Sequence, residues 1–407
     1  MSKSIGNVIL PSELIEGIAA AAPQAAAAAE APAAEPMTGR DKKSAKKTKK
    51  QRKAERNDRG KQGPLGVDVL RLWVAMSDWT SDVAIGESVL QKPREAYRRL
   101  RNSCRFMLGN LHDFDAATDS VPLDELRGGD RYMLHQLAAF AKAVEASHDA
   151  HQTHRVVSSA IVLAGDALSA DYFDAAKERL YCADATGISR RSVQTVLHHS
   201  LDTLLLALGP IVPFLVEEVH EYRREPRPPP PIERVWVSPP TEWSQPHLAQ
   251  QWQIAMSVKS EVSRMIHLAQ QEKRIKGGGE AMVELWADEY SPVYEALQSL
   301  SSELNDVLGV CASRLRALPQ ASSSGGGGEV VEAVMAEGGG EVICETPDDE
   351  VSMANRADAL KIVVRATEAP RCERCWRHVP GANTDVARGK EGLEHGGWCY
   401  RGCACYS

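Results

Sequence analysis

Apolar side chains recur at intervals of three and four residues over much of this chain, and this periodicity constrains its fold more than any other feature. The clearest stretches cover residues 96–111, 130–145, 156–168 and 192–208. Such spacing places the apolar side chains on one face of a helix. Gly209 and Pro210 follow the last stretch and predict its end. Consecutive amphipathic helices with short connections predict a helix bundle, so we expect a mainly α fold.

A smaller region of mixed structure is expected after the bundle. The proline run at 226–231 predicts an extended connector, and residues 248–273 predict a second long helix. Short strands are predicted at 235–237, 283–286, 306–310 and 360–366. Glycine-rich runs at 322–328 and 338–340 are typical of linkers. We therefore expect the bundle to be followed by a small α+β tail.

The net charge of the chain combines two oppositely charged populations. The whole sequence carries −7, whereas residues 40–61 carry 12 Lys/Arg against 3 Asp/Glu. The remainder is therefore acidic, which excludes non-specific nucleic-acid binding through bulk charge, because phosphate neutralisation supplies most of that affinity. The alanine-rich and then basic stretch 19–63 predicts a disordered insertion, which is either merely tolerated or an RNA-binding arm.

Cysteines are concentrated at the end of the chain. Five of the nine lie in the last 36 residues, and two residues separate Cys372 from Cys375, as in a zinc-binding turn. Cys399 and Cys403 supply a second pair. Four thiolates complete a tetrahedral site, so we expect a structural Zn²⁺ that folds the tail. The alternatives are adventitious cysteines or a redox pair.

The chain begins with a short stretch rich in hydrogen-bond donors. Ser2, Lys3 and Ser4 are followed by Ile5-Gly6-Asn7. A lysine between two serines can close over a polyphosphate and place its ammonium group against the charge that develops as a phosphate leaves. The same string is also typical of an ordinary solvated terminus.

Several motifs, in order along the chain, resemble the isoleucyl-tRNA synthetases of bacterial type. The opening MSKSIGN resembles the KMSKS loop of class I aminoacyl-tRNA synthetases without its first lysine. The string CERCW at Cys372 resembles the C-terminal zinc finger of the isoleucyl enzymes. Further resemblance covers residues 67–85, 95–115, 154–163, 171–181 and 190–219. The chain is therefore identified as a C-terminal fragment of such an enzyme.

The second cysteine pair departs from the family pattern. Two residues separate these cysteines in the family, whereas three separate Cys399 from Cys403 here. Cys405 is therefore an alternative fourth zinc ligand.

The resemblance implies an isoleucine–tRNA ligase, which activates isoleucine with ATP and Mg²⁺ and transfers it to isoleucine tRNA. Lys3 then corresponds to the loop lysine that stabilises the pyrophosphate side of ATP, and Ser2 and Ser4 hold that loop. The catalytic core and the editing domain are expected upstream, so the chain alone is expected to be inactive. Its own work would be recognition of tRNA and the anticodon.

Candidate tRNA contacts lie on one predicted helix and in the tail. The helix residues are Arg98, Arg99, Arg101 and Arg105. A row of arginines can meet RNA phosphates, but it is equally typical of a solvated helix face. In the tail, Arg374 is a further candidate, and Trp376 would either stack on a base or cover the metal site.

These features divide the chain into seven regions. They are the end of a catalytic domain with the KMSKS-like loop (1–18), the disordered insertion (19–63), a connection to the catalytic domain (64–84), the anticodon-binding bundle (85–225), a C-terminal junction region (226–320), Gly-rich linkers with short strands (321–369) and the zinc-binding finger (370–407).

Other functional classes remain open. One is a stand-alone tRNA- or RNA-binding zinc protein. Another is a zinc-finger DNA-repair protein, because the formamidopyrimidine-DNA glycosylases carry a related finger; their N-terminal Pro-Glu, however, is absent after Met1. Among the synthetases, the CERCW tail disfavours valine or leucine specificity.

The expected location is intracellular. No apolar run approaches the roughly 20 residues that span a bilayer, so we expect no membrane partner. Alanine, proline and glycine insertions in a bacterial-type sequence favour a chloroplast or mitochondrion of a eukaryote, with the cytoplasm as the alternative. We expect a monomer.

Overall fold

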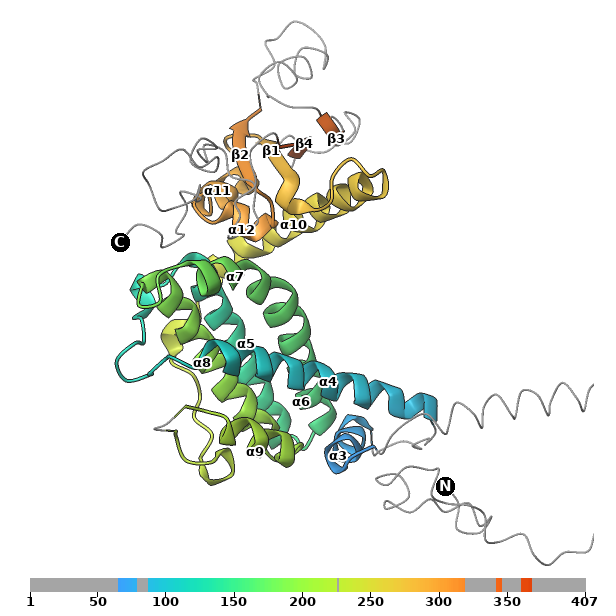
Figure 1. The fold of residues 1–407 in the computed structure, drawn as a ribbon, viewed down its shortest axis with the longest axis vertical. Helices are drawn as coiled ribbons and strands as arrows, with labels where there is room; N and C mark the ends of the chain where they lie inside the picture. The colour runs from blue at the N-terminus through green and yellow to red at the C-terminus, as the bar shows by residue number, and fades with distance from the viewer. Residues whose placement is uncertain (1–64, 79–86, 225–226, 319–341, 346–359, 368–407) are drawn as a thin grey trace, which may run out of the picture.

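The computed structural model describes residues 65–78, 87–224, 227–318, 342–345 and 360–367. A helical bundle and a smaller α/β unit lie end to end within these residues (Figure 1). The prediction of a mainly α fold is confirmed. The predicted zinc finger at 370–407 lies outside the described residues.

The bundle buries the periodic apolar positions of its helices. Its helices are α3 (Val67–Met76), α4 (Glu87–Asn110), α5 (Gly128–Asp149), α6 (Thr153–Val162), α7 (Phe173–Cys182), α8 (Ile188–Leu208) and α9 (Pro213–Glu221). Short 3-10 turns occur at η3 (Leu123–Glu125), η5 (Pro231–Glu233) and η6 (Thr241–Trp243). Leu100, Leu137, Leu197 and Leu204 are fully buried in one contiguous core. The helices predicted at 96–111, 130–145 and 192–208 are thereby confirmed.

The helix predicted at 156–168 is confirmed, but its second half is π-helical instead of α-helical. A π-helical stretch, η4 (Leu163–Tyr172), joins α6 to α7, so that the chain remains helical from 153 to 182. The Ala164 carbonyl accepts hydrogen bonds from Ser103 Oγ at 3.1 Å and Ser169 Oγ at 2.5 Å. Such side-chain bonds compete with the backbone ladder and open a helical turn.

The same helical stretch corrects the expectation that the chain holds no segment able to span a membrane. Among the described residues, the helix from Thr153 to Cys182 has a length and composition that would allow it to cross a membrane. Its apolar side chains Val156, Val157, Leu168 and Leu180 are buried in the bundle core. Helix packing within the bundle accounts for its hydropathy.

The α/β unit places one long helix against a mixed sheet. Its elements are α10 (Pro246–Gln271), η7 (Gly278–Glu280), β1 (Ala281–Ala287), α11 (Pro292–Ser299), α12 (Leu304–Leu308), β2 (Ala312–Ala317), β3 (Val342–Glu345) and β4 (Leu360–Ala366). The strand order is β2-β1-β4-β3; β1 is parallel to β2, and β4 is antiparallel to β1 and β3. Val262, Val283, Leu285 and Val364 belong to the core between α10 and the sheet.

Two of the four short strands predicted from the sequence are wrong. Residues 306–310 fall largely in α12, because Leu304, Val307 and Leu308 have helical spacing and pack into the second core. Residues 235–237 form no strand; Val235 is 83% exposed and pairs with no described strand. The strands at 283–286 and 360–366 are confirmed as β1 and β4, and the helix at 248–273 as α10.

Candidate nucleic-acid interface

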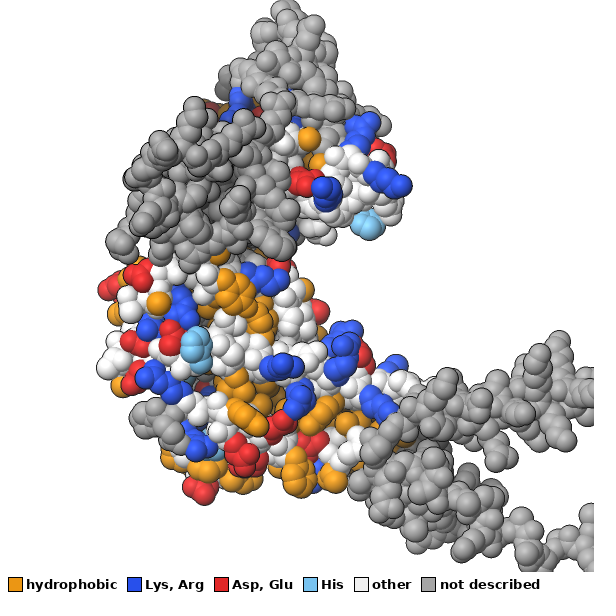
Figure 2. Space-filling model, in the orientation of Figure 1, with side chains coloured by type: hydrophobic (Ala, Val, Ile, Leu, Met, Phe, Trp, Pro, Cys, Tyr) orange, Lys and Arg blue, Asp and Glu red, His pale blue; other side chains and the backbone are white. Residues whose placement is uncertain are grey.

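Helix α4 carries the arginine row that the sequence predicts to meet tRNA phosphates. Its inward face packs into the bundle core through Leu100, Cys104 and Met107. The exposed positions between them hold Arg98, Arg99, Arg101 and Arg105. In Figure 2, basic side chains follow the course of α4 across the bundle. The helix thus presents the row to solvent.

The first two arginines of the row share one carboxylate. Glu95 accepts hydrogen bonds from Arg98 Nη2 at 2.7 Å and from Arg99 Nε at 3.2 Å. These hydrogen bonds lower the pKa of Glu95 to about 2. The charges of both arginines are therefore partly neutralised by Glu95.

The other two arginines differ in their partners. Arg101 forms an ion pair with Glu218 on α9. Arg105 is exposed and has no ion pair or side-chain hydrogen bond with any described residue. Within the arginine row, the uncompensated charge thus lies at Arg105, toward the C-terminal end of α4.

Helix α9 is fixed beside α4 by contacts with α3. Asp68 on α3 accepts a hydrogen bond from the backbone N–H of Leu215 at 2.7 Å. Arg71 on α3 donates to two backbone carbonyls in the turn that precedes α9. Tyr222 comes directly after α9 and is 76% exposed. The tyrosine ring is therefore presented to solvent from a well-anchored helix.

Two adjoining hollows share Leu108 and Tyr222 in their walls. One hollow, of about 480 Å³, is also lined by Arg101 and Arg105. The other, of about 600 Å³, is lined by four further arginines: Arg223, Arg224, Arg227 and Arg234. We call the two hollows together the Tyr222 groove.

Asp202 on α8 organises the arginine wall of this groove. Its carboxylate accepts hydrogen bonds from Arg223 Nη1 at 2.9 Å and Arg234 Nη1 at 2.6 Å. Burial alone would raise the pKa of Asp202, but the two arginines lower it to about 2. Asp202 therefore stays ionised and holds both guanidinium groups, whereas exposed Arg224 has no described partner.

His198 supplies an uncharged polar group in the same wall. Burial lowers the pKa of His198 to about 4, and the neighbouring His199 acts in the same direction. The imidazole is therefore neutral at pH 7 and can donate one hydrogen bond and accept another. A neutral donor and acceptor is suited to contact the edge of a base.

The Tyr222 groove combines the features that bind single-stranded nucleic acid. Basic side chains such as Arg105 and Arg224 can follow a phosphate backbone, and an exposed tyrosine ring can stack on an unpaired base. Sequence reasoning missed this groove because it treated the prolines after residue 225 as a connector. The run at 222–227 places a tyrosine next to three arginines and was the available signal.

The remaining predicted site residues lie outside the described part of the chain. They are Ser2, Lys3 and Ser4 of the N-terminal loop, Cys372, Cys375, Cys399, Cys403 and Cys405 of the zinc site, and Arg374 and Trp376 beside it. The structure therefore brings Arg101 and Arg105 together with Tyr222 and leaves the ATP and zinc predictions untested.

Comparisons with known proteins identify relatives of this chain. The family described as the anticodon-binding domain of tRNA ligase matches residues 130–285. An isoleucine–tRNA ligase of Thermosynechococcus vestitus is 32% identical over 379 residues, which cover 93% of this chain and 34% of that protein. One of Erwinia tasmaniensis is 31% identical over 344 residues, covering 82% of this chain and 32% of that protein. The chain thus spans about a third of the length of the curated relatives it matches.

Proposed function

The chain is a homologue of the isoleucine–tRNA ligases and contains the anticodon-binding domain of tRNA ligases, and we propose that it recognises isoleucine tRNA for such an enzyme. The proposal assigns the anticodon arm to the bundle. An anticodon loop offers unstacked bases and a closely spaced run of phosphates, which is the form of RNA that proteins read most readily.

One observation carries this proposal. Tyr222 is exposed in a groove where Arg105 and Arg224 have no partners among the described residues. Stacking on an aromatic ring is tolerant of sequence, whereas hydrogen bonds to a base edge discriminate. In this scheme Tyr222 and the free arginines supply affinity, and the neutral His198 contributes to discrimination.

The full-length enzyme would supply the chemistry. We propose that it activates isoleucine with ATP and Mg²⁺, with Lys3 of the N-terminal loop against the phosphates and Ser2 and Ser4 holding the loop. The cysteine spacing supports a structural Zn²⁺ in the tail, held by Cys372, Cys375, Cys399 and either Cys403 or Cys405. We further propose a monomer in a chloroplast or mitochondrion.

The proposal is tested by binding of the full, zinc-loaded chain to isoleucine tRNA and to the same tRNA with its anticodon changed. We expect clear preference for the native anticodon, with an affinity that falls as salt rises. Equal and salt-sensitive binding to both tRNAs would mean that basic residues hold RNA without reading it, and the proposal would fail. Preference for duplex DNA over either tRNA would instead support the DNA-repair alternative.

A further inference from the structure

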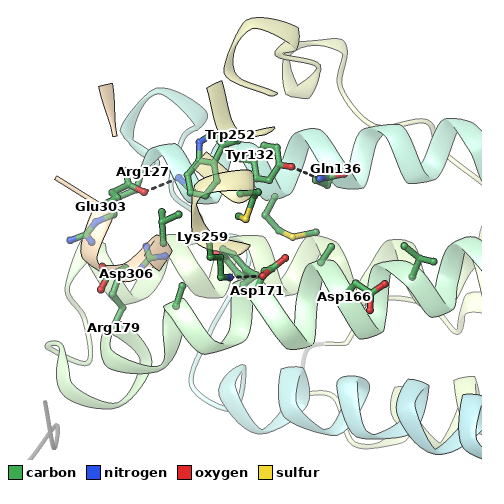
Figure 3. Close-up of a pocket in the computed structure, with 18 residues that line it drawn as sticks. Arg127, Tyr132, Gln136, Asp166, Asp171, Arg179, Trp252, Lys259, Glu303 and Asp306 are labelled. Atoms are coloured by element: carbon green, nitrogen blue, oxygen red, sulfur yellow. Dashed lines mark hydrogen bonds and ion pairs between the residues drawn. The ribbon is translucent and has the colours of Figure 1, made fainter. Parts of the chain in front are cut away.

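A cavity lies where the bundle meets the α/β unit. It has a volume of about 250 Å³, and its walls come from α5, η4, α7, α10 and α12 (Figure 3). It shares no residue with the Tyr222 groove. Cavities at such junctions, with apolar walls and a few polar groups, are common sites for small ligands.

Two aromatic rings that stack on one another line this junction cavity. The rings of Tyr132 on α5 and Trp252 on α10 stack with centroids 4.8 Å apart and an interplanar angle of 9°. Met133 and Met256 line the cavity beside them. Stacked rings and flexible thioethers favour contact with a planar, polarisable ligand.

The polar groups of the cavity occupy separate places along it. Figure 3 shows Asp166 and Gln136 at one end and Arg127 at the other, with Lys259 between them. Lys259 Nζ lies 2.5 Å from Asp171 Oδ1. Asp166 and Arg127 are exposed, and their side chains have no hydrogen bond or ion pair with any described residue. Two opposite charges therefore remain available at the two ends.

The π-helical stretch η4 supplies two of the four carboxylates that line the cavity; the other two, Glu303 and Asp306, lie toward the Arg127 end. Asp166 and Asp171 belong to η4, and both line the cavity. Stretches of π-helix are rare and frequently occur at functional sites, because the wider turn redirects side chains. The backbone irregularity and the cavity thus coincide.

We propose that the junction cavity binds a guanine nucleotide, either free or as an unpaired guanine of RNA. The base would lie against the Tyr132–Trp252 pair. Its N1–H and N2–H groups would donate to the two oxygens of Asp166, and its O6 would accept from Lys259. The phosphate would meet Arg127 at the far end. Only the RNA form of this proposal rests on the proposed tRNA recognition.

The first experiment is calorimetric titration of the full chain with GMP, AMP, CMP and UMP. GMP is expected to bind most tightly, because guanine alone presents two adjacent donors to one carboxylate. Asp166→Asn should weaken GMP binding about tenfold, since an amide cannot accept both bonds. Asp174→Asn is the matched control, because Asp174 pairs with Lys177 and does not line the cavity. It should leave GMP binding unchanged.

A second arm distinguishes the two sources of the base. An RNA hairpin with one unpaired guanine is compared with the same hairpin carrying uracil there. Val162→Trp should block the cavity mouth without disturbing the core, because Val162 lines the cavity and is 54% exposed. If Val162→Trp abolishes only GMP binding, the ligand of the cavity is a free nucleotide. If it abolishes the preference for the guanine hairpin, the ligand is a guanine of RNA.

The inference is overturned if neither GMP nor the guanine hairpin is preferred, or if Asp166→Asn and Val162→Trp change neither preference. Its failure is separable from failure of the proposed function. Tyr222→Ala tests tRNA binding through a groove that shares no residue with the cavity, and should leave GMP binding intact.

Discussion

The bundle and the α/β unit fold by different rules. The bundle core is built from helices whose apolar residues repeat every three or four positions, so each helix carries its own burial pattern. The α/β core depends on pairing between distant strands, such as Val283 of β1 opposite Val364 of β4. Local pattern therefore specifies the first region, and long-range pairing specifies the second.

The two regions also differ in how they satisfy buried charge. In the bundle, Asp130 is fully buried and accepts hydrogen bonds from Arg179 at 2.7 and 2.8 Å and from Tyr172 at 2.7 Å. In the sheet, Glu284 is equally buried, but its Oε2 lies 3.3 Å from Arg365 Nε, and its Oε1 has no partner among the described residues. The bundle pair is the better satisfied of the two.

The largest expected effect comes from breaking the bundle pair. Asp130→Asn should lower the free energy of unfolding by about 3–5 kcal/mol, because Arg179 is left buried without its counterion. Glu284→Gln should lower it less, by about 1–2 kcal/mol, because among the described residues the Glu284 side chain has only one polar contact, of 3.3 Å with Arg365, which has a further interaction of its own. Urea unfolding of both variants measures the difference. Equal losses would contradict the contrast between the two regions.

Acidification should lower the free energy of unfolding through partly buried histidines in the bundle. The pKa of His198 in α8 is lowered from 6.5 to about 4 by burial, so the unfolded chain takes up the proton before the folded chain does. The stabilisation is complete above about pH 6.5 and is lost as the pH falls toward 4, with a slope of at most about 1.4 kcal/mol per pH unit for one proton. Burial lowers the pKa of His199 in the same direction.

Urea midpoints measured from pH 7 to pH 4.5 check this prediction. His198→Gln should flatten the profile, because the variant has one fewer buried imidazole to protonate. Asp202 does not interfere, since its pKa of about 2 keeps it ionised throughout this range. An unchanged slope in the variant would show that the acid sensitivity arises elsewhere.

Features that depend on residues close together in the chain could be predicted from the sequence. The α4 arginines and the helical period around Leu197 are visible in short windows, and both were found in the structure. The ion pair between Arg101 and Glu218 joins residues 117 positions apart, so no window could reveal it. The strand predicted at 306–310 failed for a related reason, because a short apolar run fits a helix and a strand equally well.

Binding of RNA should depend on the bundle and not on the α/β unit. Tyr222→Ala should weaken tRNA binding by about 1–3 kcal/mol, the usual value of one stacked base. Tyr290→Ala is the matched control, because Tyr290 is 83% exposed but lies in the α/β unit. Arg105→Gln should make the affinity for tRNA less dependent on salt, by about the amount that one phosphate contact contributes. Equal losses of tRNA affinity in the two tyrosine variants would contradict the assignment of RNA binding to the bundle.

The smallest expected effect lies at the contact between the two regions. Both oxygens of Glu303, next to α12, accept hydrogen bonds from the backbone N–H groups of Gly128 and Gly129 at 2.8 Å. The α/β unit thereby caps the N-terminus of a bundle helix, a contact that joins residues 175 positions apart. A side chain on either glycine would place its Cβ 3.2 Å from a Glu303 oxygen, so the carboxylate would have to shift by a few tenths of an ångström.

Glu303→Ala should lower the free energy of unfolding by about 1 kcal/mol, the usual contribution of a helix cap. The first N–H groups of α5 lose their acceptor in this variant. Hydrogen exchange should accelerate at Gly128 and Gly129 while the middle of α5 stays protected. Gly129→Ala should reproduce part of the effect by displacing the carboxylate. Glu295→Ala on α11 is the control, because Glu295 is exposed and has no described partner. It should change neither the free energy of unfolding nor the exchange at the two glycines. If exchange at the two glycines is unaltered in Glu303→Ala, the two regions are joined by their apolar contacts alone.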